Sequence, residues 1–204
     1  MTKSPTRLKT KEKLMRKIVF DIETDGIITT VGNKQVFPNM YVVCIYDSQT
    51  DKFSSYTKEQ LKDLWPILEK ADLLIGYNSD SFDIPILNNY YSGDLTKIAS
   101  LDLLSEIKKS LGRRIKLDNV AEATLGRNKT GHGLEAMEWW KQGRYQDVID
   151  YCTEDVRITK DIYEYALKNG FLKYKDIKDI KEIKLDTSKW HEKKDSAMTF
   201  TLPF

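Results

Sequence analysis

The pattern of apolar residues constrains this chain most, because it changes from strand-like to helix-like along the sequence. Short runs rich in β-branched and aromatic residues predict strands at 17–23, 40–47, 52–56, 73–77 and 98–102. Apolar residues on one helical face predict helices at 58–70 and 146–168, and Pro85 suits the first turn of a helix at 83–91. Strands that precede helices and then alternate with them predict an α/β domain with a central sheet.

The remaining segments give weaker signals. Residues 31–35 are predicted to form the turn before the second strand, and residues 103–143 are predicted to be helical but broken by glycines at 112, 126, 131 and 133. Residues 173–184 alternate in charge and carry three isoleucines, so a short surface helix and a flexible tail are the alternatives. We expect three parts: a basic flexible tail at 1–16, one domain at 17–170 and a charged C-terminal extension at 171–204.

Composition excludes several classes of protein. The apolar runs are much shorter than the roughly 20 residues of a membrane span, so we expect no membrane partner. Cys44 and Cys152 lie in apolar segments, which favours buried thiols in a reducing, cytoplasmic setting. With two histidines and no C-x-x-C pair, a zinc site is not expected.

The net charge of +2 is distributed unevenly. Residues 1–17 carry seven Lys/Arg and one Glu, and residues 18–170 sum to −6. The basic leader either contacts phosphates or is merely solvated. Inside the expected domain, the densest basic cluster is Arg113, Arg114 and Lys116, for which contact with a nucleic-acid backbone and a solvated face are the alternatives.

Asp21 and Glu23 form the first candidate site. Side chains alternate faces along a strand, so these carboxylates project from one face of the strand predicted at 17–23. At ~5 Å and an effective dielectric of about 20, they repel by roughly 3 kcal/mol. A divalent cation such as Mg²⁺ or Mn²⁺ prefers oxygen ligands and turns this repulsion into binding. A solvated strand edge is the alternative.

Further carboxylates follow later elements. Asp83 stands where the helix expected at 83–91 begins, so it either joins the site or caps that helix. Tyr151 and Asp155 are four positions apart in the predicted last helix and therefore project from one face. They either share a site with the first carboxylates, or they are a core tyrosine and a rim aspartate.

The order of these motifs resembles that of the DEDD 3′–5′ exonucleases of the ribonuclease H-like superfamily, in their tyrosine (DEDDy) branch. The runs that carry the resemblance are V-F-D-I-E-T at 19–24, L-I-G-Y-N at 74–78 with F-D-I-P-I-L at 82–87, and D-Y-C-T-E-D-V at 150–156. They are similar to the three exonuclease motifs of family B DNA polymerases and to the YprB-like group of stand-alone exonucleases. The resemblance covers residues 17–168 and implies a ribonuclease H-like fold, with a central mixed sheet flanked by α-helices.

The resemblance implies a role for each matching residue. The ligands of two divalent metal ions, Mg²⁺ or Mn²⁺, are implied to be Asp21, Glu23, Asp83 and Asp155. Tyr151 is implied to orient or help deprotonate the attacking water. The histidine branch places its histidine five residues before the last aspartate, where this chain has Asp150. Four residues are implied to bind the substrate: Ile22 and Thr24 by touching the terminal nucleotide, Asn78 by helping to order the second motif, and Phe82 by packing beside that nucleotide or, alternatively, in the core.

The activity that follows is metal-dependent hydrolysis of single-stranded DNA or RNA from its 3′ end, with release of nucleoside 5′-monophosphates. The sequence does not decide between DNA and RNA. Two alternatives remain: a structure-selective endonuclease of the same superfamily, and a non-catalytic nucleic-acid-binding module with a decayed site. The presence of all four carboxylates and the tyrosine argues against decay.

Overall fold

The structure is a computed structural model that describes residues 15–127 and 133–191. Within these ranges, a central sheet has the strand order β5-β4-β1-β6-β7. Its strands are β1 (Lys17–Thr24), β4 (Met40–Asp47), β5 (Lys52–Thr57), β6 (Leu73–Gly76) and β7 (Ser100–Asp102). The β5-β4-β1 side is antiparallel, and the β1-β6-β7 side is parallel. This mixed sheet confirms the architecture predicted from the apolar pattern.

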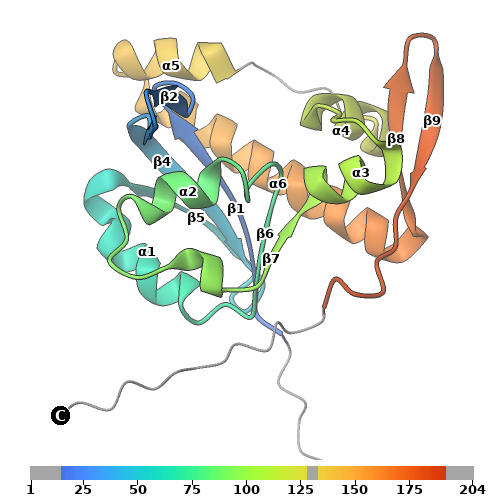
Figure 1. The fold of residues 1–204 in the computed structure, drawn as a ribbon, viewed down its shortest axis with the longest axis horizontal. Helices are drawn as coiled ribbons and strands as arrows, with labels where there is room; N and C mark the ends of the chain where they lie inside the picture. The colour runs from blue at the N-terminus through green and yellow to red at the C-terminus, as the bar shows by residue number, and fades with distance from the viewer. Residues whose placement is uncertain (1–14, 128–132, 192–204) are drawn as a thin grey trace, which may run out of the picture.

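Helices cover both faces of the sheet. They are α1 (Leu61–Leu68), α2 (Asp83–Asn88), α3 (Leu103–Leu111), α4 (Leu117–Leu125), α5 (Gly133–Lys141) and α6 (Tyr145–Asn169), with short 3₁₀ turns at η1 (Lys58–Gln60) and η2 (Leu95–Lys97). Figure 1 shows α1 and α2 on one face and α6 crossing the other. Each face has its own apolar core, one under α1 and α2 and one under α6.

The central strand β1 belongs to both cores. Ile18 and Phe20 pack into the core beneath α1 and α2, whereas Val19 packs into the core beneath α6. A strand that is covered on both faces needs apolar residues at consecutive positions, which explains the unbroken run at 18–20. By the same alternation, the odd-numbered positions that follow Val19 face α6.

Two segments differ from their sequence-based predictions. Residues 31–35, predicted as a turn, contribute to a small hairpin of β2 (Thr29–Val31) and β3 (Lys34–Val36). Residues 173–184, predicted as a helix or tail, belong to a second hairpin of β8 (Phe171–Asp176) and β9 (Asp179–Lys184). The spacing of the isoleucines resembled a helix face, but Ile183 is buried whereas Ile177 and Ile180 are exposed.

The broken helical segment separates at its glycines. Gly112 and Gly126 follow the last residues of α3 and α4 as their C-caps. Gly133 begins α5 instead of interrupting it, and Gly131 lies outside the described residues. The predicted helix at 83–91 ends earlier, at Asn88.

The expected N-terminal tail lies outside the described residues up to position 14, but Arg16 is anchored in the fold. Its guanidinium donates two hydrogen bonds to Asp47, at 3.1 and 2.6 Å. Its backbone N–H donates to Asp72 at 2.8 Å. Arg16 is therefore fixed in the fold just before β1, while the division into tail, domain and extension stays a prediction.

We expect Asp47→Asn to lower the free energy of unfolding by about 2–4 kcal/mol at pH 7, because it leaves the largely buried Arg16 without its ionic partner. Burial raises the pKa of the Asp47 carboxyl, but the hydrogen bonds from Arg16 and Gln49 and the Arg16 charge together hold it below the usual value. The stabilisation is thus present above about pH 4 and lost as the pH falls through the lower folded-state pKa.

Urea unfolding of the wild type and of Asp47→Asn at neutral and acidic pH measures this difference. The difference in free energy of unfolding between the two proteins is expected to become smaller below about pH 4. A gap of equal size at both pH values would show that the ionised carboxylate is not its source.

Candidate active site

Asp21 and Glu23 lie on the face of β1 that α6 covers. Both follow Val19 at intervals of two residues, and Val19 packs in the core beneath α6. A contact with Cys152 confirms that Asp21 faces α6, since the Cys152 Sγ lies 3.5 Å from the Asp21 carbonyl oxygen and 3.8 Å from the Asp21 Oδ2. The prediction that both carboxylates share one face therefore agrees with the structure.

Asp155 of α6 completes a cluster of three carboxylates. Oxygens of Asp21, Glu23 and Asp155 all lie within 4.8 Å of one another. Glu23 and Asp155 are 9% and 5% exposed, so solvent screens their charges poorly. Among the residues that the structure describes, this is the group of acidic, histidine or cysteine side chains close enough to bind a metal ion.

Asp83 of α2 (Asp83–Asn88) also contacts β1, beyond the point where β6 stops pairing with that strand. Pairing between β1 and β6 extends only to Val19, so the later part of β1 has no strand beside it there. The Asp83 carboxylate, at the first residue of α2, accepts a hydrogen bond from the backbone N–H of Ile22. Asp83 thus contacts the residue between Asp21 and Glu23, although it is not within the cluster of three.

Burial dominates the electrostatics of Asp83, which is 4% exposed. Burial and the nearby Asp102 charge raise the pKa of Asp83 to about 7, despite hydrogen bonds from its own N–H and that of Ile22. The helix-cap alternative does not describe this residue, because Phe82 occupies the N-cap position of α2. Burial therefore disfavours ionisation of Asp83, and a nearby cation would stabilise its charged form.

Asp102 is a residue that sequence reasoning missed. This buried aspartate ends β7 and caps α3, accepting hydrogen bonds from the N–H groups of Leu104 and Ser105 at 2.9 and 3.3 Å. It also accepts from the N–H of Asn78 at 2.8 Å, which fixes the loop that leads to Asp83. The available signal was a carboxylate at the end of the strand predicted at 98–102.

The four residues implied in substrate contacts lie beside the carboxylates but differ in what they present. The Ile22 side chain packs into the core beneath α1 and α2, so only its backbone faces the site. The Thr24 hydroxyl donates to the Gly26 carbonyl at 2.7 Å. Phe82 packs partly against the core beneath α1 and α2. Asn78 lies in the loop between β6 and α2 and has a left-handed backbone conformation, with a φ of 69°.

Aromatic side chains of α5 border Tyr151, which is 8% exposed. The rings of Trp139 and Tyr151 meet edge to face, with centres 6.1 Å apart. The neighbouring Trp140 stacks on Tyr41 at 4.6 Å. Both tryptophans are half-buried, and Trp139 helps hold the Tyr151 ring in place.

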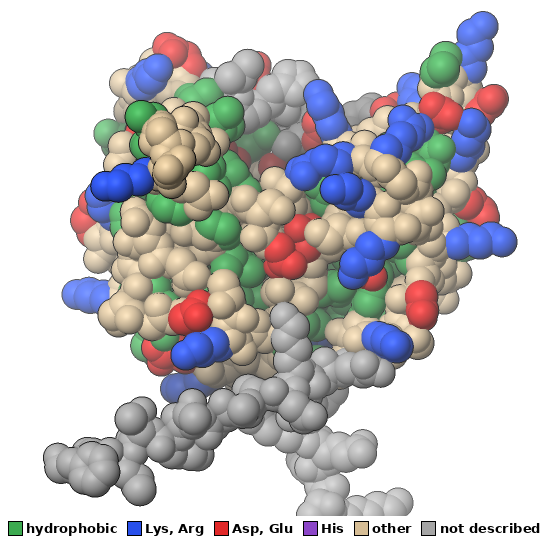
Figure 2. Space-filling model, in the orientation of Figure 1, with side chains coloured by type: hydrophobic (Ala, Val, Ile, Leu, Met, Phe, Trp, Pro, Cys, Tyr) green, Lys and Arg blue, Asp and Glu red, His purple; other side chains and the backbone are tan. Residues whose placement is uncertain are grey.

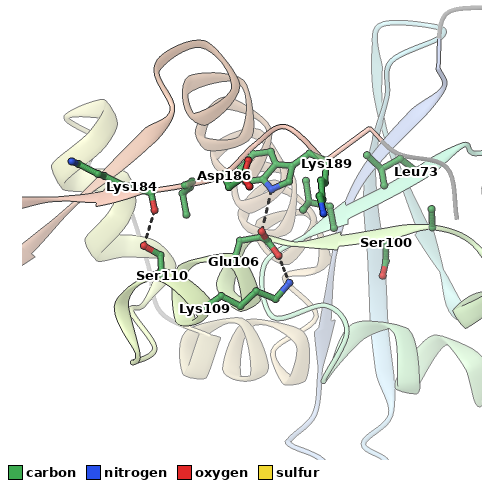
Figure 3. Close-up of a pocket in the computed structure, with 12 residues that line it drawn as sticks. Leu73, Ser100, Glu106, Lys109, Ser110, Lys184, Asp186 and Lys189 are labelled. Carbon is green, nitrogen blue, oxygen red and sulfur yellow. Dashed lines mark hydrogen bonds and ion pairs between the residues drawn. The ribbon is translucent and has the colours of Figure 1, made fainter.

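A surface cavity of about 740 Å³ lies elsewhere and contains none of the candidate residues. It is lined by residues that include Leu73, Ser100, Glu106 and Lys189 (Figure 3). Leu73 and Ser100 begin β6 and β7, whereas Asp83 and Asp102 lie after or at the ends of these parallel strands. Because ligands of open α/β sheets bind at the carboxyl ends of the strands, the cavity is not the candidate active site.

Comparison with known proteins identifies the family. Residues 18–167 match the family model of the RNase H superfamily. The chain therefore belongs to this superfamily, and its mixed sheet with flanking helices is the ribonuclease H-like fold expected from the motifs.

Solved structures support the same fold. The family B DNA polymerase from the hyperthermophilic archaeon Pyrobaculum calidifontis matches with a TM-score of 0.59 and 18% sequence identity, over 76% of this chain. The chain spans 25% of that polymerase. No match was found among curated proteins. None of the helices that the structure describes is long and apolar enough to cross a membrane.

Proposed function

We propose that this protein is a metal-dependent 3′–5′ exonuclease of the tyrosine (DEDDy) type, which hydrolyses single-stranded DNA or RNA to nucleoside 5′-monophosphates. The observation that carries the proposal is the convergence of Asp21, Glu23 and Asp155, whose oxygens lie within 4.8 Å of one another. Membership of the RNase H superfamily supports nuclease activity in general.

The donor set fits hard divalent cations. Every candidate ligand is a carboxylate, and oxygen donors suit Mg²⁺ and Mn²⁺. Under this proposal, two such ions are held by Asp21, Glu23, Asp83 and Asp155. When bound, the ions would make water more acidic and stabilise the leaving 3′ oxygen. Cation binding would also favour the ionised form of Asp83, whose pKa burial raises.

The protein's own groups bind and orient the substrate. A tyrosine hydroxyl keeps its proton at pH 7, so Tyr151 would position the attacking water by a hydrogen bond rather than remove its proton. The Asn78 amide and the backbone around Ile22 and Thr24 would contact the terminal nucleotide, and Phe82 would pack beside it. The Asp102 carboxylate holds the Asn78 loop in place for this contact.

The test is incubation of the purified protein with 5′-labelled single-stranded DNA and its RNA counterpart, with Mg²⁺, Mn²⁺ or EDTA. A metal-dependent ladder that shortens from the 3′ end is expected, and the faster substrate identifies the preferred nucleic acid. Cleavage of a substrate blocked at its 3′ end would instead support the endonuclease. Binding without degradation under any metal would support the non-catalytic module.

A further inference from the structure

A basic surface lies beside the candidate active site, formed by the α3–α4 loop at 113–116 and the β8–β9 hairpin at 171–184. Together these segments carry eight Lys/Arg and three Asp/Glu, a net charge of +5, while the whole chain carries +2. Figure 2 shows Lys and Arg side chains gathered over α3, α4 and this hairpin. Such a concentration of charge attracts polyanions.

Arg114 and Arg113 join this surface to the site. The exposed Arg114 donates from Nη2 to the Asn78 Oδ1 at 2.5 Å, so it lies directly on the loop that precedes Asp83. Arg113 bonds Asp176 of the hairpin at 3.2 Å, and its guanidinium lies 5.2 Å from the centre of the Tyr174 ring. The basic surface is therefore continuous with the candidate active site.

The hairpin is held firmly by α4. The Asn119 side chain accepts from the Lys175 N–H at 2.7 Å and donates to the Lys175 carbonyl at 2.9 Å. Thr124 makes the same pair of bonds with Lys173, at 2.9 and 3.0 Å. These side chains take the place of a neighbouring strand along β8, so the hairpin projects its tip in a fixed direction.

The tip of the hairpin combines strain with apolar exposure. Ile177 has a φ of 50°, which β-branched residues avoid, and its side chain is 92% exposed. Ile180 is 63% exposed. Hairpin turns ordinarily place Asn, Asp or Gly at such positions. The backbone conformation of Ile177 costs free energy in the free protein, and Ile177 and Ile180 together place apolar surface in water at the tip, so a contact made in a complex would account for both features.

The tip's neighbours define the partner. Lys175, Lys178 and Lys181 are exposed around Ile177. Lys175 and Lys181 form exposed ion pairs with Glu122 and Asp176, at 3.2 and 2.5 Å, and exposed pairs of this kind contribute little, so phosphates can compete for both lysines. An anionic partner with apolar surface fits this tip, and a single strand offers phosphates beside unstacked bases. We propose that the basic surface binds the single strand upstream of the 3′ end held at the carboxylates, with the lysines on its phosphates and Ile177 against a base. This inference rests on the proposed function.

The test is binding of a 5′-labelled single strand of about 20 nucleotides, longer than a typical single-strand site. It compares a lysine-to-alanine triple variant at 175, 178 and 181 with a control triple variant at Lys62, Lys70 and Lys97. The control lysines are also exposed and lie near α1 and η2, away from the hairpin. Fluorescence anisotropy in EDTA, where the strand stays intact, gives affinity across a salt series.

We expect the hairpin triple variant to bind about tenfold more weakly and to lose roughly 2 from the slope of log K against log salt, because each phosphate contact contributes about 0.7. The control triple variant should retain the wild-type slope. Equal affinities and slopes in the two triple variants, or no binding of nucleic acid by the wild type, would overturn the proposal.

Ile177→Gly separates a binding role from a structural one. Glycine accepts a positive φ, so the thermal midpoint should stay the same or rise, while affinity for the long strand falls about threefold. Unchanged affinity would show that Ile177 does not contact the bound strand. Because binding is measured without cleavage, a protein that binds through the hairpin but degrades nothing would contradict the proposed exonuclease and leave this surface established.

Discussion

Asp155→Asn should abolish hydrolysis, with turnover reduced by roughly 10³-fold or more, while the protein stays folded. The substitution removes one of the three carboxylates whose oxygens lie within 4.8 Å, and with it a charge that the divalent ions require. The side chain keeps its shape, so the helix face that carries Asp155 should pack as before. Asp21→Asn is expected to behave in the same way.

Stability provides a readout that is independent of activity. Like charges within 4.8 Å repel, so without metal the free energy of unfolding of Asp155→Asn should equal the wild-type value or exceed it by about 1–3 kcal/mol. Mn²⁺ at about 100 times its dissociation constant should stabilise the wild type by roughly 2.7 kcal/mol. The variant should lose most of this gain, which thermal unfolding with and without Mn²⁺ measures.

Asp150→Asn is the matched control. Asp150 lies on the same helix but is exposed and accepts a hydrogen bond from the Gln146 side chain at 2.7 Å. Its neutralisation should leave both turnover and the Mn²⁺ stabilisation intact. Tyr151→Phe gives the complementary result, because it should keep the Mn²⁺ stabilisation and lose turnover. Turnover that survives in both Asp21→Asn and Asp155→Asn would show that the carboxylate cluster is not the active site.

Local periodicity accounts for the part of the site that the sequence predicts well. Alternation along β1 places Asp21 and Glu23 on one face, and the helical repeat places Tyr151 and Asp155 on one face of α6. Neither periodicity reports that these two faces meet. That relation came from the resemblance to known motifs, and in the structure the Cys152 contact with Asp21 shows it directly.

The features that the sequence did not predict depend on where distant elements end. Asp83 can accept the Ile22 N–H because β6 pairs with β1 only as far as Val19, and no local pattern marks that limit. The Asp102 carboxylate accepts a hydrogen bond from the backbone N–H of Asn78, which lies 24 residues earlier in the sequence. Likewise, Asn119 and Thr124 of α4 form hydrogen bonds with the backbone of β8. These distant contacts hold the β8–β9 hairpin, although its charged sequence resembles a helix or a tail.

Gly76→Ala should lower turnover about 10- to 100-fold, because it displaces the loop that carries Asp83. A Cβ at Gly76 would lie 2.4 Å from the Ser79 Cβ and 2.5 Å from the Ser79 Oγ. Ser79 is 1% exposed, and its carbonyl accepts from the Ile84 N–H at 2.9 Å. Ser79 therefore cannot turn away unless the start of α2 moves with it. Overpacking of this kind also costs about 1–3 kcal/mol in unfolding free energy.

A second substitution tests whether that contact is the cause. Ser79→Gly removes both clashing atoms, so Gly76→Ala/Ser79→Gly should recover turnover to within about threefold of Ser79→Gly alone. Gly26→Ala is the control, since its Cβ would meet nothing closer than the Pro38 Cβ at 3.9 Å. Steady-state kinetics on one labelled oligonucleotide compares these four variants with the wild type. A double variant as slow as Gly76→Ala would trace the defect to β6 itself, and the loop would then not be what positions Asp83.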